Sequence, residues 1–207
     1  MPEFSEVYHH RMRYFLTPQF DMYRNIRNDI DSLCFKRWGG GMSGDGPAIS
    51  ILDYGCGNGV GSVLLKKNGW KVTGVDSDEE AIAFAGDAWG HLCSFKAEDW
   101  AENLTPYANA FDVVVCLEVI EHVLNPEAML HSLKRSLRSN GMIYISTLNH
   151  NSQYRKNRGH IGKFCLADFT ALIHEFFPAA LVVDYSLKDR LEEGSSLTPM
   201  VAAWRAP

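Results

Sequence analysis

The sequence predicts an α/β fold built on a mostly parallel sheet of seven strands with an antiparallel last strand, from three observations. From residue 49 onward, short apolar runs alternate with segments of helical periodicity, as in strand–helix–strand units. The run at residues 111–116 is apolar and β-branched, which is typical of a strand buried on both faces. Only a loop separates the last two apolar runs, so they should pair antiparallel at one edge of the sheet.

The expected strands are short apolar runs bounded by turn residues. They lie at residues 49–53, 71–76, 93–99, 111–116, 141–147, 180–187 and 199–205. The expected helices alternate with them, and right-handed crossovers should connect the parallel strands. These helices lie at residues 60–69, 79–89, 126–137 and 166–177. Gly69 should end the first helix, and Asn125 with Pro126 provides an N-cap and a first-turn proline for the third.

Residues 1–46 differ in composition from the remainder of the chain. They are rich in aromatic and basic side chains and end in a glycine cluster at residues 39–46, which is typical of a flexible connector. Two helices broken near Pro18 are expected before this cluster. We therefore expect residues 1–46 to form a helical cover with its connector, and residues 47–207 to form the main domain.

Composition limits the class of protein before any motif is considered. The 207 residues are 46% hydrophobic and 22% charged, which is ordinary for a globular chain and excludes a disordered or fibrous one. The net charge of −5 argues against nucleic acid or anionic lipid as a partner. Five scattered cysteines without a CxxC pair indicate a reduced, cytoplasmic setting. We expect neither a secretory signal nor stable insertion into a membrane.

A glycine-rich loop, YGCGNG at residues 54–59, joins the first expected strand to the first expected helix. Such a loop lets a ligand approach the backbone closely and meet free N–H groups at the start of a helix. The spacing is neither the dinucleotide GxGxxG, since Val60 stands at the last position, nor a phosphate-binding P-loop. Asp76 ends the second strand 21 residues after Gly55, where a carboxylate can take both ribose hydroxyls of an adenosine.

Five segments resemble, in order and spacing, the successive motifs of class I S-adenosylmethionine-dependent methyltransferases. They are ILDYGCGNG, VTGVDSDEEAI, AED, FDVVVCLEVIEHV and NGMIYIST, within residues 49–147. The resemblance implies a Rossmann-like class I methyltransferase sandwich. It also implies that residues 47–207 form an S-adenosylmethionine-binding domain and that S-adenosyl-L-methionine is the cofactor.

The resemblance also implies cofactor contacts at the carboxyl ends of the expected strands. These residues are Asp53, Gly55, Cys56, Gly57, Asp76, Ser77, Asp99, Trp100 and Leu117. The glycine loop would lie under the methionine part of the cofactor, and Asp76 would hold the ribose with Ser77 beside it. Asp99 would face the adenine amino group. Trp100 would cover the ring or offer its backbone N–H, and Leu117 would lie at the methionine end.

A second group of reactive side chains follows the strand at residues 111–116. If this segment is helical, Glu118, Glu121 and His122 share one face, with Cβ atoms about 5–6 Å apart. Two carboxylates and an imidazole suit a divalent cation or an acid–base cluster, and His160 offers a further ligand. Three interpretations stay open. The four residues bind Mg²⁺ or Mn²⁺, or His122 or His160 is a catalytic base without metal, or the group shapes the pocket.

This second group of side chains indicates which methyltransferases the sequence resembles most in this region. LEVIEHV, ISTLNHN and GHIGKF are similar to segments of ubiquinone-biosynthesis O-methyltransferases. The ExxEH segment with a distant histidine also resembles small-RNA 2′-O-methyltransferases, and in both families the cluster is associated with a metal. The segment between Asn151 and His160 is short compared with the quinone enzymes, so a membrane-docking insert is missing.

The function expected from these features is S-adenosylmethionine-dependent methylation of a small-molecule acceptor, at oxygen. A sulfonium methyl is already electrophilic, so the protein must align the acceptor and exclude water, while a hydroxyl acceptor also needs its proton removed. The alternatives are an RNA 2′-O-methyltransferase, a nicotinamide-dependent dehydrogenase and a non-catalytic S-adenosylmethionine-binding protein. The acceptor, the atom that is methylated and the oligomeric state stay open.

Overall fold

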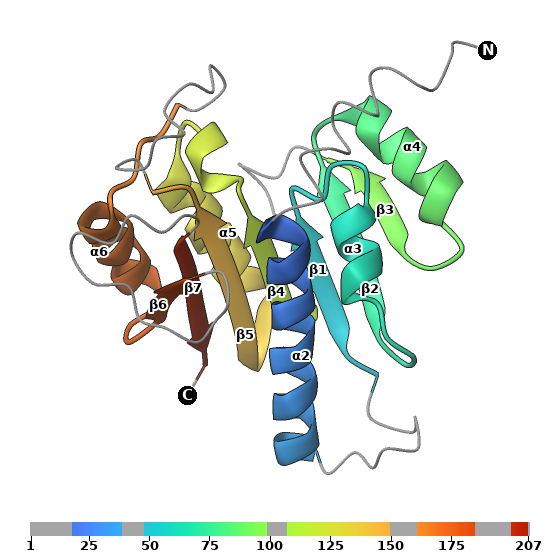
Figure 1. Ribbon diagram of the computed structural model, residues 1–207, viewed down its shortest axis with the longest axis horizontal. Helices are drawn as coiled ribbons and strands as arrows, with labels where there is room; N and C mark the ends of the chain where they lie inside the picture. Colours follow the sequence, from blue (N-terminus) through green and yellow to red (C-terminus); the bar gives the residue numbers. More distant parts are fainter. Residues whose placement is uncertain (1–17, 39–47, 99–106, 150–160, 185–199, 207) are drawn as a thin grey trace.

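The computed structural model describes residues 18–38, 48–98, 107–149, 161–184 and 200–206 (Figure 1). Its seven strands form one sheet in the order β3-β2-β1-β4-β5-β7-β6. Strands β1 to β5 pair in parallel, whereas β7 pairs antiparallel with both β5 and β6. The predicted fold, including the antiparallel pairing of the last two strands at one edge, is confirmed.

The strands are β1 (Ser50–Tyr54), β2 (Lys71–Asp76), β3 (Ser94–Ala97), β4 (Phe111–Leu117), β5 (Leu137–Thr147), β6 (Leu181–Asp184) and β7 (Met200–Arg205). The helices are α2 (Pro18–Trp38), α3 (Val60–Leu65), α4 (Glu79–Trp89), α5 (Pro126–Ser136) and α6 (Leu166–Phe176), with a 3₁₀ turn, η2 (Ile120–His122). Helix α3 ends at Leu65 rather than at Gly69, because Lys66 is already extended and Gly69, with φ 80°, belongs to the turn before β2.

The sheet lies between two helical layers, because strand residues alternate between its faces. In β4, Val113 and Val115 pack on one face while Val114 and Cys116 pack on the other. Helices α2 and α3 cover the first face, α5 and α6 cover the second, and α4 packs beside β2 and β3 (Figure 1). Because β1 to β5 are parallel, their carboxyl ends lie together at one edge of the sheet, between the two helical layers.

Helix α2 is packed into the core. Met22, Ile26 and Ile30 repeat every fourth residue and are fully buried, so one stripe of the helix faces the sheet. On the same helix, the carboxylate of Asp29 accepts a hydrogen bond from the Tyr144 hydroxyl at 2.6 Å. The cover function predicted for residues 1–46 stays a prediction, since residues 1–17 and 39–47 lie outside the described residues.

Two smaller findings concern the chemical setting of the described residues. No helix among them is long and apolar enough to cross a membrane. The cysteines in this part of the chain are free thiols, namely Cys56, Cys93, Cys116 and Cys165.

Candidate functional site

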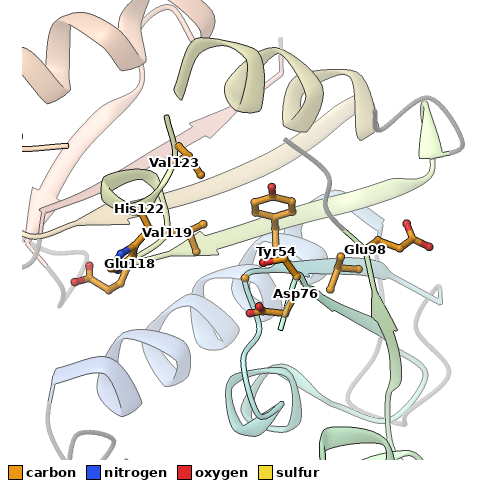
Figure 2. A pocket seen from close by; sticks show the side chains of 10 residues that line it. Tyr54, Asp76, Glu98, Glu118, Val119, His122 and Val123 are labelled. Atoms are coloured by element: carbon orange, nitrogen blue, oxygen red, sulfur yellow. The ribbon is translucent and has the colours of Figure 1, made fainter. Parts of the chain in front are cut away.

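A cavity of about 300 Å³ opens at the carboxyl ends of β1, β2 and β4 (Figure 2). The strand order runs in opposite directions from β1 and β4, and such a switch point is where open α/β sheets bind ligands. The cavity is lined by Tyr54, Gly55, Val75, Asp76, Ser77, Glu98, Glu118, Val119, His122 and Val123. Three predicted cofactor residues, Gly55, Asp76 and Ser77, are therefore brought together here.

The glycine loop takes a conformation that needs glycine at position 55. Gly55 has φ 74°, and its N–H donates to the carbonyl of Val75 at 2.7 Å. A Cβ atom at this position would lie 2.2 Å from Cγ2 of Val119. The missing side chain thus lets the loop after β4 approach the loop after β1.

Asp76 lies between the glycine loop and α4. Its Oδ2 accepts the N–H of Gly57 at 2.8 Å, and its Oδ1 accepts the N–H of Asp78 at 3.0 Å. A carboxylate oxygen has two lone pairs, so with respect to the described residues each oxygen can accept one more hydrogen bond. The geometry suits a vicinal pair of hydroxyls, which is the group predicted for this residue.

Three other predicted cofactor residues lie beneath the cavity and are not among its lining. Asp53 is fully buried, and its carboxylate accepts hydrogen bonds from Tyr23 and Ser62. Burial raises the pKa of Asp53 to about 6. Cys56 and Leu117 are each 6% exposed, and burial raises the pKa of the Cys56 thiol well above its usual value. A thiol held neutral in this way is a poor nucleophile.

The remaining predicted residues of the cofactor and metal sites are placed as follows. Gly57 is not among the lining residues, but its N–H donates a hydrogen bond to the Asp76 carboxylate. A Cβ at Gly57 would meet no atom within 4 Å, so this turn of the loop faces open space. Asp99, Trp100 and His160 lie outside the described residues, and their roles stay predictions.

The condition under which Glu118, Glu121 and His122 would share one helical face is not met. Glu118 has φ 57°, and its N–H bonds back to Ser146 of β5, so only residues 120–122 form a turn. Ser146 donates to Glu118 at 2.7 Å and Thr147 donates to Glu121 at 3.1 Å, because both carboxylates face the end of β5. Glu118 and the exposed His122 line the cavity, whereas Glu121 is 2% exposed.

The metal prediction finds no support in this geometry. Among residues 18–38, 48–98, 107–149, 161–184 and 200–206, no three His, Cys, Asp or Glu side chains form a group that could hold a metal ion. Burial, together with the negative charge of Glu121, raises the pKa of Glu118, and burial raises the pKa of Glu121. The pair therefore favours holding a proton at neutral pH.

Five lining residues were not among the site residues predicted from the sequence. They are Tyr54, Val75, Glu98, Val119 and Val123. The first four are immediate neighbours of predicted site residues at the strand ends, so adjacency to those motifs was the available signal. Val123 likewise follows a predicted residue, His122, and it reaches the cavity because the chain leaves the turn η2 in an extended conformation.

A family model described as "Methyltransferase domain" matches residues 10–181. The chain belongs to this methyltransferase domain family. The match confirms the predicted resemblance to S-adenosylmethionine-dependent methyltransferases and the predicted enzyme class.

This methyltransferase domain is 36% identical over 110 residues to the ubiquinone biosynthesis O-methyltransferase of Hydrogenovibrio crunogenus (strain DSM 25203 / XCL-2). The aligned residues cover 49% of this chain and 44% of that relative. The match thus spans less than half of the relative's length.

Solved structures share the fold of this methyltransferase domain. The plantazolicin methyltransferase BamL, in complex with a triazolic desmethylPZN analog and SAH, has a TM-score of 0.68 and 19% identity, covering 90% of this chain and 84% of that one. The [4+2]-cyclase SpnF has a TM-score of 0.60 and 15% identity, covering 86% and 80%. Because a cyclase shares the fold, the fold alone does not determine the reaction.

Proposed function

We propose that this methyltransferase domain binds S-adenosylmethionine in the cavity of Figure 2 and transfers the methyl group to a hydroxyl oxygen of a small-molecule acceptor. The observation that carries the proposal is the Asp76 carboxylate, held by Gly57 and Asp78 with one accepting position left on each oxygen. Methylation at oxygen is supported by the relatives named ubiquinone biosynthesis O-methyltransferase.

The cofactor side of the site would be formed by the loops after β1 and β2. Asp76 would accept the two ribose hydroxyls, with Ser77 beside it. The loop at Gly55 and Gly57, where no Cβ atoms stand, would let the methionine part approach the backbone. The bound cofactor supplies an electrophilic methyl group, so the chain itself has to position the acceptor, exclude water and take up a proton.

On the acceptor side, His122 is our proposed base. Its side chain is exposed at the cavity on the β4 side, opposite Asp76 (Figure 2). A neutral imidazole nitrogen can take a proton from a hydroxyl group. Glu118, held by Ser146, lies on the same side and would orient that hydroxyl. His160 stays a second candidate base from the sequence alone.

The proposal is tested in two steps with the wild-type chain. The first measures S-adenosylhomocysteine, S-adenosylmethionine and NAD binding by thermal shift and calorimetry. The second follows transfer of a labelled methyl group to a panel of phenols, catechols and RNA 3′ ends, with and without prior chelation. We expect S-adenosylhomocysteine to bind, and a hydroxylated small molecule to be labelled even after chelation.

The same measurements separate the alternatives. Stabilisation by NAD alone would indicate a dehydrogenase, and labelling of RNA would indicate a nucleic-acid methyltransferase. Binding of S-adenosylhomocysteine without labelling of any acceptor would favour a binding protein or a reaction other than methyl transfer. Loss of turnover on chelation, restored by Mg²⁺ or Mn²⁺, would contradict the metal-free mechanism.

A further inference from the structure

Tyr23 of helix α2 contacts Asp53 and Gly61, which lie on either side of the glycine loop. The Tyr23 ring lies against α3 at Gly61, where a Cβ atom would be 2.2 Å from Cζ of the ring. Its hydroxyl donates to Oδ1 of Asp53 at 3.2 Å, and the tyrosine is 7% exposed. A helix far away in the sequence thus contacts the residue from which the cofactor loop begins.

Asp53 depends on hydroxyl donors from two helices. Its Oδ2 accepts a hydrogen bond from Ser62 of α3 at 2.7 Å, and Tyr23 of α2 satisfies the other oxygen. The carboxylate is fully buried, and among the described residues it forms no ion pair. The next two residues, Tyr54 and Gly55, line the cavity. Movement of Asp53 would therefore be passed directly to the site.

We propose that Tyr23 is a positioning residue for cofactor binding, which acts with Ser62 to hold the Asp53 carboxylate in place beneath the glycine loop. This inference rests on the proposed function. It makes α2 part of the cofactor site, although no residue of α2 is among those lining the cavity.

The electrostatics around Asp53 explain why the hydroxyl matters. The hydrogen bonds from Ser62 and Tyr23 lower the pKa of Asp53, whereas burial and the charge of Asp76 raise it to about 6. The thiols of Cys56 and Cys116 also face this region from the loop and from β4. Without the Tyr23 hydroxyl, the pKa of Asp53 rises further and the loop loses negative charge beneath it. That charge would attract the ammonium of the amino-acid part of a bound S-adenosylmethionine.

The test compares two Tyr→Phe substitutions, each of which removes one hydrogen bond between helix α2 and the rest of the domain. Tyr23→Phe removes the bond to Asp53, and the control Tyr144→Phe removes the bond from Tyr144 to Asp29 of α2. Calorimetry with S-adenosylhomocysteine at pH 7 should show affinity reduced about tenfold in Tyr23→Phe and unchanged in Tyr144→Phe. As the pH is lowered, Tyr23→Phe should also lose affinity at a higher pH than wild type does.

The calorimetry results distinguish failure of the role of Tyr23 from failure of the proposed function. Equal affinity in Tyr23→Phe and wild type, or equal losses in both variants, would overturn the inference while leaving the proposed function intact. If Tyr23→Phe does not fold, Ser62→Ala is measured instead, because it removes the donor to the other oxygen of Asp53. Failure of the wild type to bind S-adenosylhomocysteine would overturn the proposed function and this inference together.

Discussion

The carboxylate of Asp76 accepts the backbone N–H of Gly57 at 2.8 Å, so the end of β2 is joined directly to the glycine loop. Two strand ends that are parallel neighbours in the sheet are thereby held in a fixed relation at the cavity. A cofactor that bonds to Asp76 would meet a carboxylate that is already oriented. Such preorganisation reduces the loss of conformational freedom on binding.

Asp76→Ala should lower the affinity for S-adenosylhomocysteine at least about tenfold, since two hydroxyls would lose a charged acceptor. Asp78→Ala is the matched control. Asp78 caps α4 by accepting from Glu80 and Ala81, and it does not line the cavity. The control should cost about 1 kcal/mol of stability and leave the affinity unchanged. Unchanged affinity in a folded Asp76→Ala protein, by calorimetry, would remove the ribose assignment.

His122→Gln should reduce kcat about 100-fold or more on a hydroxyl acceptor, because the variant cannot take up the proton. The affinity for S-adenosylhomocysteine should stay within about twofold, since the lost group is not an acceptor for the cofactor. His131→Gln, an exposed site on α5, serves as the control and should keep full turnover. A pH–rate profile unchanged by His122→Gln would transfer the role of base to another residue.

The raised pKa of Asp53 predicts that the free energy of unfolding depends on pH. Its pKa is raised from 3.8 to about 6 in the folded protein, so folding favours the protonated form. The corresponding stabilisation is complete below pH 3.8 and is lost as the pH rises through about 6. Since a tenfold difference in proton affinity is worth about 1.4 kcal/mol, wild type should lose about 2 kcal/mol relative to Asp53→Asn between about pH 4 and pH 7. Urea unfolding of both proteins across this range measures the difference, and a constant difference would refute the raised pKa.

Two helical glycines should respond in opposite directions to alanine. In α4, a Cβ at Gly86 would meet no atom within 4 Å, so Gly86→Ala should stabilise the protein by about 0.5–1 kcal/mol. In α3, a Cβ at Gly61 would clash with the Tyr23 ring, so Gly61→Ala should destabilise the protein. If the role of Tyr23 is correct, Gly61→Ala should also weaken binding of S-adenosylhomocysteine. Urea unfolding and calorimetry provide the two measurements.

Much of the fold could be predicted because local and tertiary preferences agree. Helix α4 occupies the predicted residues 79–89, and the predicted N-cap Asn125 accepts the N–H of Ala128 at 2.9 Å. Strand β5 is longer than predicted and begins directly at Leu137, where α5 ends. The polar residues 138–140 carry no apolar signal, and they lie where the pairing with β4 shifts register between Leu137 and Met142.

The site was predicted where it depends on motif spacing and missed where it depends on the path of a loop. Asp76 and Gly55 lie where the spacing places them. The helical face considered for Glu118, Glu121 and His122 does not form, because Glu118 is left-handed and its N–H bonds to Ser146. The contact between Tyr23 and Asp53 joins residues 30 positions apart in different elements, which periodicity cannot reveal. The cytoplasmic location and the cover function stay predictions.

The position of β7 has a consequence for how the chain folds as it leaves the ribosome. Strand β7 follows β6 in the sequence but lies between β5 and β6, and its Ala202 pairs with Ile145 on one side and Val182 on the other. Until Met200–Arg205 has been synthesised, β5 keeps an open edge and β6 has no partner in the sheet. A nascent chain halted before Met200 would expose unpaired backbone along both strands and would be prone to aggregate or to recruit chaperones.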